Sequence, residues 1–569
     1  MKRAWDMFWF LLTQTPPVHL IWCGVLLAIL LFLILIRRRW SVFEEDIRRY
    51  KRLCLLPLLL TTVHYVIFVA GASDFLRDYT PLYLIALLPL VLLLCAGYDK
   101  GFRIFAPIIG VMAVVFALRF CTMETNPHNF TRQSYTRSFH SFVQEMDRSY
   151  VLKEWKEIDF QALETKYMPL VEAAEQAKDP AAFADAVTMF CNELHDGHVS
   201  VRFDYDETAY HSAFQVPDYG LAMIRLDSGE VIAVCTEPEV NRLGIEDGTV
   251  ITRWNGKPVP EAAEDVPDYG IPVKANADRL VWIDLSATGG DTAEVTFLDK
   301  AGTEQTVSLS AREDEHTLGE ACDAFSHSTG SMRELLSENY STKMLDEKCG
   351  YLLLATETTM NPLRDSLTTY TGSCPWAKKM FREKLRSLKA AGMEYLVIDL
   401  RNNMGGFGEV GYALCELLTD EDFYASGTGC RRNGSYIRIS ESRICGDGEF
   451  ADLPVVALTN YNCISAGDST ALCLSRLPNV TLAGITDPNG SGQMTGGCCA
   501  LSGAVVSVNY PIILTLNEQG EPDIDPRADR ISRNPVEVRI PFDYDAAMQM
   551  FHDKEDYELA WAVAYLEGK

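Results

Sequence analysis

The sequence predicts an α/β core with a small inserted β-domain and an N-terminal helical part, preceded by a membrane anchor. Three observations predict this: four apolar runs in the first 120 residues, short strands with glycine turns between residues 219 and 256, and alternating strands and helices after Gly350. A chain of 569 residues is too long for a single core. We expect an anchor at 1–121, a helical part at 122–205, the β-domain at 206–310 and the α/β core at 311–569.

Four apolar runs each approach the ~20 residues that cross a hydrocarbon core. They cover Val18 to Ile36, Leu53 to Gly71, Leu82 to Tyr98 and Ile104 to Phe120, and they are almost free of charge. One such run is often a buried core helix, but four in succession indicate transmembrane helices, so the lipid bilayer is an expected partner. His64 interrupts the second run, and one histidine need not prevent insertion.

The distribution of positive charge predicts the orientation of this anchor. Seven basic residues lie between the first and second runs and two lie between the third and fourth, whereas the loop between the second and third carries only Arg77. By the positive-inside rule both termini are outside, which makes the chain a multi-pass cell-membrane protein with its large C-terminal part extracytoplasmic. Lys2 and Arg3 favour the opposite orientation.

Composition excludes several classes of partner and cofactor. The formal net charge is -27, which disfavours nucleic acid as a partner because phosphate contacts need clustered Lys and Arg. The sixteen cysteines include no C-x-x-C pair, and neither a metal nor an organic cofactor is implied. Cys430 and Cys445 flank a segment that reads as a hairpin and are candidates for a disulfide, although a set of buried free thiols is equally compatible.

Between residues 130 and 190 apolar residues recur at helical spacing, and a short motif follows, Leu194-His195-Asp196-Gly197-His198-Val199. A series of short strands and turns comes next: residues 219–224, 231–234, 243–248 and 250–256. That series resembles a PDZ domain, and the resemblance implies carboxylate-binding amides near Tyr219, Gly220 and Leu221. A generic small β-module is the alternative, because Asn-Gly and Asp-Gly turns are common.

After Gly350, strand-like segments at residues 351–354, 395–400 and 455–458 alternate with helical ones at residues 377–391, 408–418 and 466–477, as in a largely parallel sheet. The string Asp399-Leu400-Arg401-Asn402-Asn403-Met404-Gly405-Gly406 ends a strand in paired glycines, which lets backbone amides face a bound group. The segment Asn462-Cys463-Ile464-Ser465-Ala466-Gly467-Asp468 reads as a turn that delivers a serine onto a helix.

Together with the motif at 194–199, and in this order, these strings closely resemble the C-terminal processing (tail-specific) peptidase family over nearly all of residues 130–544. The resemblance implies a core of layered sheet and helices of the ClpP/crotonase type. It also implies that Ser465 is the nucleophile, and that the N–H groups of Ala466 and of Gly405 or Gly406 are the oxyanion donors. One such donor is typically worth ~100- to 1000-fold in rate.

The chain departs from this family in the residue expected to act as the general base. Serine/lysine members carry a lysine some two dozen residues beyond the serine, whereas Ser491 stands near that place here, and no lysine occurs between Lys389 and Lys554. Tricorn-type and nisin-resistance-type relatives instead place a histidine at the end of the motif at 194–199, where this chain has His198. An unperturbed histidine, with a pKa of ~6.5, suits general-base work at neutral pH.

A histidine base generally needs an orienting acid. Tricorn-type relatives place a glutamate shortly before a Pro-Asp pair, which implies Glu518 first and Glu521 second, although an acidic surface turn fits this stretch equally well. Asp468 is expected to support the start of the helix and the loop geometry rather than to transfer protons.

The sequence thus predicts a membrane-anchored, extracytoplasmic serine endopeptidase that cuts peptides or unstructured protein tails with Ser465 and His198. The alternative is a catalytically silent peptide-binding or sensor protein that uses the PDZ-like groove, because a decayed enzyme would also lack the lysine. The substrate and the oligomeric state stay open.

Overall fold

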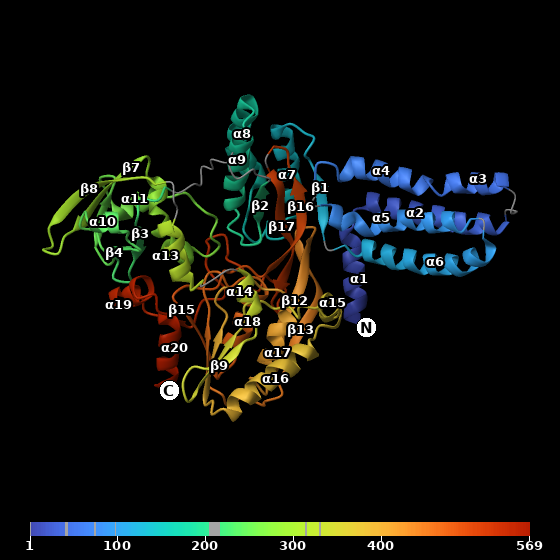
Figure 1. Cartoon of the computed structure of the whole chain (residues 1–569). Helices are drawn as coiled ribbons and strands as arrows, with labels where there is room; N and C mark the ends of the chain where they lie inside the picture. Colours follow the sequence, from blue (N-terminus) through green and yellow to red (C-terminus); the bar gives the residue numbers. More distant parts are fainter. Residues whose placement is uncertain are drawn as a thin grey trace.

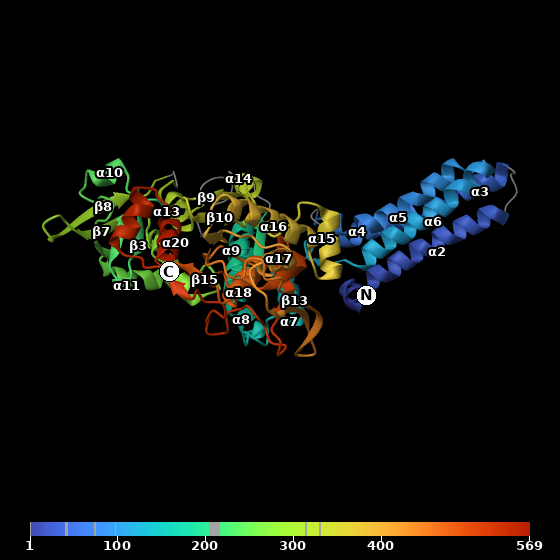
Figure 2. The same ribbon diagram turned by 90° about the horizontal axis from the view of Figure 1, so that it is seen from below.

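The computed structural model describes residues 2–39, 44–72, 75–96, 98–123, 125–203, 217–312, 316–328, 332–503 and 505–568. Three parts follow one another along the molecule in both views (Figures 1 and 2). A helical bundle lies at one end, an α/β body in the middle and a small β-domain at the other end. The N-terminal helix lies against the body, beside the near end of the bundle.

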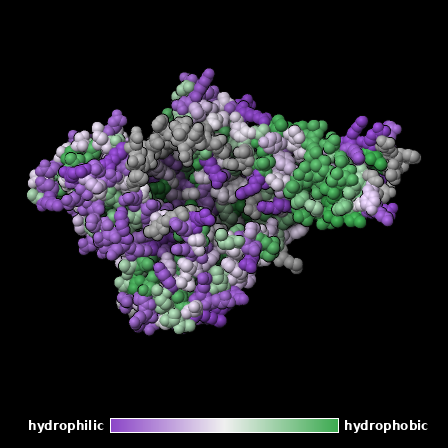
Figure 3. Space-filling view, viewed as in Figure 1, coloured by the Kyte–Doolittle hydropathy of each residue, from purple (hydrophilic) through white to green (hydrophobic). Residues whose placement is uncertain are grey.

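The bundle confirms four long apolar helical segments. The segments that are long and apolar enough to cross a membrane are Pro17–Arg37, Glu45–Phe68, Leu76–Leu94 and Lys100–Cys121. The helices behind them are α2 (Pro17–Arg39), α3 (Glu44–Leu53), α4 (Leu56–Phe68), α5 (Leu76–Leu94) and α6 (Asp99–Cys121). Most of their apolar side chains face outward, among them Leu59 and Val111 at 62% and 66% exposure. Figure 3 shows the resulting apolar surface on the face of the bundle that is in view, a surface that a water-soluble monomer rarely exposes.

His64 does not face outward from the bundle, where lipid would lie. It is fully buried, and its ring bonds to His19 Nδ1 at 3.1 Å and to the Tyr83 hydroxyl at 3.1 Å. The Tyr79 hydroxyl pairs in turn with His19 Nε2 at 3.0 Å. A polar chain within the bundle therefore satisfies the histidine, which is how polar groups are accommodated in transmembrane segments.

The body contains a six-stranded sheet ordered β18-β15-β14-β11-β10-β9, whose strands are parallel except for β9. Its strands are β9 (Thr342–Met344), β10 (Cys349–Leu353), β11 (Tyr395–Asp399), β14 (Val455–Leu458), β15 (Val480–Gly484) and β18 (Val538–Arg539). β11, β14 and β15 are buried throughout, as parallel strands covered on both faces are. Around them lie α13 (His316–Ser326), α14 (Met332–Ser337), α16 (Pro375–Ala390), α17 (Gly408–Cys415), α18 (Ala466–Ser475), α19 (Tyr544–Ala547), η4 (Met548–His552) and α20 (Tyr557–Glu567).

A second, mostly antiparallel sheet runs β1-β16-β17-β12-β13, with β2 paired to β17. Its strands are β1 (Asn126–Asn129), β2 (Ser200–Phe203), β12 (Asp422–Arg432), β13 (Ser435–Cys445), β16 (Gln493–Ala500) and β17 (Val505–Leu516). The predicted helical part packs on it as α7 (Tyr135–Ser149), α8 (Phe160–Ala177) and α9 (Pro180–Asn192), with Phe139, Phe183 and Phe190 in one shared core. Asp159 and Asp179 cap α8 and α9 through the first free N–H groups. α1 (Lys2–Gln14) and α15 (Pro362–Thr371) lie at the β13 side.

The small β-domain has a core of its own, which includes Trp254 and Phe297. It consists of β3 (Ala222–Arg225) paired with β4 (Val231–Val234), and of a second sheet with β5 (Ile251–Trp254), β6 (Lys257–Pro258), β7 (Thr292–Leu298) and β8 (Glu304–Ser310). Its helices are α10 (Pro238–Asn241), α11 (Val259–Ala262), η2 (Ala263–Asp265), α12 (Lys274–Leu280) and η3 (Ile283–Thr288). Residues 206–216 of the predicted β-domain lie outside the described residues.

The candidate disulfide was wrong, although the hairpin between its two cysteines is formed. Cys430 pairs with Ile437 near the turn of the β12–β13 hairpin, whereas Cys445 pairs with Asp422 at its open end. Both cysteines are free thiols. The two residues lie at opposite ends of the hairpin, too far apart for a bridge.

Candidate active site

Ser465 occupies the turn between β14 and α18 in a backbone conformation that L-residues rarely adopt, with φ 64° and ψ -120°. It stands at the N-cap position of α18, yet its side chain makes no capping hydrogen bond. Such strain at a strand-to-helix turn is typical of residues that present a side chain to a site. Among the described residues the Ser465 hydroxyl has no hydrogen-bond partner, and Ser465 lines a pocket together with Gly406 and Ala466.

The two glycines of the 399–406 string behave differently. Gly405 is buried, and its N–H donates to Asn403 Oδ1 at 2.7 Å, so this amide is already occupied. A Cβ at Gly405 would lie 2.6 Å from Ser465 Cβ, which shows how closely the string approaches the nucleophile. Gly406 is exposed, and among the described residues neither its N–H nor that of Ala466 has an acceptor. Of the two glycines that the sequence left open, Gly406 is the one with an available donor.

The motif at 194–199 contacts the Ser465 segment through Ser491. The Gly197 N–H donates to Ser491 Oγ at 3.0 Å, and the Ser465 N–H donates to the Ser491 carbonyl oxygen at 3.0 Å. A Cβ at Gly197 would lie 2.8 Å from Ile464 Cδ1, so the two turns are in contact. Ser491 is fully buried and links the His198 turn to the Ser465 turn.

Asp468 holds this link in place, as expected from the sequence. Its carboxylate accepts the N–H groups of Gly490 and Ser491, each at 3.0 Å. Burial raises the pKa of Asp468 to about 7, and these two amides lower it only in part. Asp468 thus fixes the loop that carries Ser491.

The His198 ring is desolvated by burial. Its Nδ1 is buried without a hydrogen-bond partner among the described residues. Burial lowers the pKa of His198 below its usual value of 6.5, and the Asp196 carboxylate partly offsets this. Asp196 accepts the His198 backbone N–H at 2.9 Å and the Tyr150 hydroxyl at 2.7 Å. The imidazole is therefore neutral at physiological pH, which is the form that a general base needs.

The structure does not bring Glu518 to His198. Glu518 is exposed in the turn after β17, where its carbonyl oxygen accepts Arg438 Nη2 at 2.7 Å, and Glu521 is also exposed. The buried acids of this region are Asp523 and Asp525, and the sequence reasoning missed Asp525. Its Oδ1 accepts Gln493 Nε2 at 2.9 Å, its Oδ2 has no partner among the described residues, and burial raises its pKa well above the usual range.

A buried lysine does lie near the His198 motif, far upstream in the sequence. Lys156 Nζ donates to the carbonyl oxygens of Leu194 and His195 at 2.8 Å and 2.6 Å, and it lies 3.9 Å from Asp525. Those acceptors suit an ammonium ion that braces the motif, not a base that must be free to take a proton. The sequence offered no signal for this contact, because Lys156 is separated from the motif by two helices.

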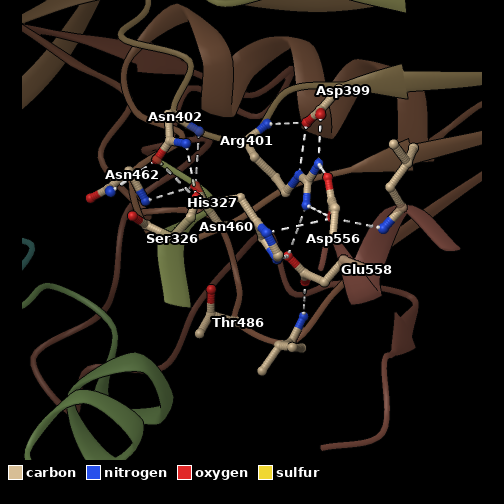
Figure 4. Close-up of polar contacts among 12 residues, drawn as sticks. Ser326, His327, Asp399, Arg401, Asn402, Asn460, Asn462, Thr486, Asp556 and Glu558 are labelled. Atoms are coloured by element: carbon tan, nitrogen blue, oxygen red, sulfur yellow. Dashed lines mark hydrogen bonds and ion pairs between the residues drawn. The ribbon is translucent and has the colours of Figure 1, made fainter. Parts of the chain in front are cut away.

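A network of ion pairs around Arg401 stabilises the 399–406 string (Figure 4). Arg401 pairs bidentately with Asp399 (Nε–Oδ1 3.0 Å, Nη2–Oδ2 2.7 Å) and with Asp556 (both contacts 2.7 Å). The Asn402 N–H donates to Asn460 Oδ1 at 3.0 Å, which ties the string to the turn before Ser465. A recess of about 700 Å³ opens beside this network and is lined by Met404 and Asn462 among others.

The peptide-binding amides expected in the β-domain are partly occupied. The Gly220 N–H donates to Asp218 Oδ1 at 2.7 Å. The Tyr219 and Leu221 side chains are buried in the domain core, where the Tyr219 ring packs edge-on against Trp254. The Gly220 N–H is therefore not free to donate to the carboxylate of a bound peptide in this conformation.

Comparisons with known proteins identify the class of the central body. Residues 366–525, which include Gly405, Gly406, Ser465 and Ser491, match the family model Peptidase family S41. The chain therefore carries an S41 peptidase domain and is a serine-type peptidase by that domain. No curated protein matches the chain.

Solved structures with a similar outline are distant in sequence. Mature CPAF is 15% identical, with 77% of this chain and 98% of that chain covered and a TM-score of 0.49. The photosystem II D1 C-terminal processing protease is 17% identical, with 74% and 97% covered and a TM-score of 0.32. The tricorn protease is 14% identical, with 76% and 36% covered and a TM-score of 0.33.

Proposed function

We propose that this protein is a membrane-anchored, extracytoplasmic serine endopeptidase that hydrolyses peptides or unstructured protein tails. Ser465 is the nucleophile, His198 is the general base, and the N–H groups of Gly406 and Ala466 bind the oxyanion. The observation that carries the proposal is the shared contact at Ser491, which accepts N–H groups from both Gly197 and Ser465 at 3.0 Å. The side chain after Gly197 is that of His198, so base and nucleophile stand on touching turns.

The reaction needs no group beyond these residues. His198 takes the Ser465 hydroxyl proton as the oxygen attacks the scissile carbonyl, and the oxyanion forms against Gly406 and Ala466. The protonated imidazole then gives its proton to the leaving amine, and an acyl-enzyme remains on Ser465. Water, deprotonated by His198, attacks the acyl carbon; the bond to Ser465 Oγ breaks, the imidazolium returns its proton to that oxygen, and the carboxylic acid product leaves. His198 works without Glu518, and the Asp196 carboxylate supports the charge that the imidazole gains.

Two features support the extracytoplasmic location. α1 packs on the peptidase body through Met7, Phe10 and Leu11, so the N-terminus lies on the same side of the bundle as the body, as an even number of spans requires. The C-terminal end of α2, the helix α3 and the start of α6 lie at the far end of the bundle (Figure 1). Those are the segments rich in arginine and lysine, which the positive-inside rule places in the cytoplasm.

We assign substrate presentation to the small β-domain. Its short strands leave edges to which an extended peptide can add as a further strand, the binding mode of PDZ domains. Because the Gly220 amide is occupied by Asp218, the terminal carboxylate of a bound tail would be held by the neighbouring amides.

Covalent labelling with a fluorophosphonate tests the proposal on the full chain in detergent. We expect the wild type to label and Ser465→Ala not to label, with equal thermal unfolding of the two. Absence of labelling in the folded wild type would instead support the catalytically silent, peptide-binding alternative.

A further inference from the structure

A carboxylate lies in the pocket beside Ser465. Glu409, in the first turn of α17, lines this pocket together with Gly406, Ala466 and Ser465. A substrate carbonyl oxygen that binds the Gly406 and Ala466 amides lies at this pocket, because both residues line it. Glu409 therefore lines a pocket that the side chain on the amino side of the scissile bond can enter.

The Glu409 carboxylate already forms an ion pair with a basic residue of the same protein, Arg3. Arg3 Nη2 pairs with Glu409 Oε1 at 2.5 Å, and Arg3 Nη1 donates to the Glu441 carbonyl oxygen at 2.8 Å and to Ser442 Oγ at 3.1 Å. Arg3 and Glu409 are only 17% and 12% exposed. Ser442 also lines the pocket, so Arg3 bonds to two groups of its wall.

The pocket has a volume of about 60 Å³, and Arg3 is not among the residues that line it. Arg3 reaches Glu409 from outside the pocket and neutralises its charge, so a substrate cation in the pocket competes with Arg3 for the same carboxylate. The Glu409 Oε2 atom has no hydrogen bond among the described residues, so the carboxylate retains acceptor capacity.

We propose that Glu409 makes this pocket a subsite for a basic substrate side chain, and that Arg3 of the N-terminal helix is its resident competitor. This rests on the proposed peptidase function. The apolar face of α1 is buried on the body through Met7, Phe10 and Leu11, so Arg3 competes at a high effective concentration. The wild type therefore accepts small neutral residues at this position and disfavours Arg and Lys, and loss of Arg3 reverses the preference.

The test uses the full chain in detergent and a synthetic peptide library whose cleavage sites are mapped by mass spectrometry. Arg3→Ala is expected to raise cleavage after Arg and Lys, relative to cleavage after Ala, by about tenfold or more. Arg3→Lys should retain the wild-type pattern. The matched control is Lys2→Ala, which removes the same charge from the adjacent, exposed residue and should also leave the pattern unchanged. Adding Glu409→Gln to Arg3→Ala should abolish the gain.

Two results would overturn the inference: a wild-type cleavage pattern in Arg3→Ala, or a basic preference that survives Glu409→Gln. Glu409→Asp, which keeps the charge, guards against misfolding of the glutamine variant, and thermal unfolding checks each protein. Fluorophosphonate labelling separates the two proposals. Labelled variants with unchanged patterns contradict the subsite alone, whereas a folded wild type that never labels contradicts the peptidase function and the subsite with it.

Discussion

The Ser465 backbone N–H donates to the Ser491 carbonyl oxygen at 3.0 Å, so Ser491 contacts the backbone of the proposed nucleophile directly. The Ser491 hydroxyl oxygen accepts the Gly197 N–H, one residue before His198. Ser491 thus joins the turn of the proposed nucleophile to the turn of the proposed base.

Ser491→Ala should slow the reaction while Ser465 keeps its position. The variant loses the hydrogen bond from the Gly197 N–H, worth about 1 kcal/mol, and leaves that amide unpaired, so we expect a loss of about 10-fold in kcat/KM or labelling rate. Ser491→Lys should not restore a lysine base, because the site is fully buried and already filled. Equal labelling rates in the wild type and Ser491→Ala would show that this contact does not position the base.

Gly406→Ala should abolish activity and destabilise the body by about 2 to 4 kcal/mol. Gly406 has φ 139°, and a Cβ there would overlap the Glu357 carbonyl oxygen. Gly434→Ala is the matched control, because Gly434 also has a positive φ, 75°, but faces open space at the hairpin turn. It should cost about 1 kcal/mol without loss of activity. Chemical unfolding and labelling of both variants measure the difference, and equal effects would contradict a special role for Gly406.

The acid limb of the pH profile should lie below pH 6.5. Burial lowers the pKa of His198, so its imidazole stays unprotonated, and able to act as a base, to lower pH than a free histidine. The measurement is kcat/KM, or the labelling rate, from pH 4 to 8. The same midpoint in Asp468→Asn would assign the limb to His198, whereas a midpoint above 6.5 would contradict the burial of this imidazole.

Asp468 should make the protein less stable as the pH rises. Its pKa is about 7 in the folded protein and 3.8 in a free side chain, chiefly because it is buried. Between these two values the folded state binds more protons than the unfolded state, so the unfolding free energy falls as pH rises from 4 to 7, by up to about 4 kcal/mol. Asp468→Asn should flatten this dependence. Parallel slopes for both proteins in thermal unfolding would show that Asp468 does not contribute.

Arg401→Met should cost about 3 to 5 kcal/mol, because the buried carboxylate of Asp399 and the partly buried one of Asp556 lose their shared partner. Arg242→Met removes an exposed arginine, 70% accessible, that pairs with Glu239, and should change stability by less than about 1 kcal/mol. Denaturant unfolding of the two variants checks the contrast. A small loss for Arg401→Met would mean that the network does not support the 399–406 string.

Local patterns predicted the elements well and the site in part. Continuous apolar runs identified the four long helical segments of the bundle, and the strand-to-helix turn at Ser465 followed from the residues around it. The occupied amides were missed for one shared reason. Asn403 accepts the N–H of Gly405, and Asp218 accepts that of Gly220, each two residues along the chain. Both are Asx turns, which the spacing could have signalled.

Contacts between distant residues could not be read from the sequence. Arg3 and Glu409 are 406 residues apart, Gly197 and Ser491 are 294 apart, and no local pattern relates either pair. The position of Glu518 shortly before a Pro-Asp pair favoured it as the orienting acid. It lies in an exposed turn, because the strand before it ends at Leu516. Tertiary packing decides such roles.

The most direct test of the central claim compares fluorophosphonate labelling in the wild type, His198→Asn and His195→Asn, with the modified residue located by mass spectrometry. His195 lies in the same motif, bonds to Asp268 at 2.7 Å and has φ 43°, which asparagine tolerates. The account predicts a label on Ser465 in the wild type and in His195→Asn, and a rate at least about 100-fold lower in folded His198→Asn. Equal labelling of Ser465 in all three proteins would contradict it.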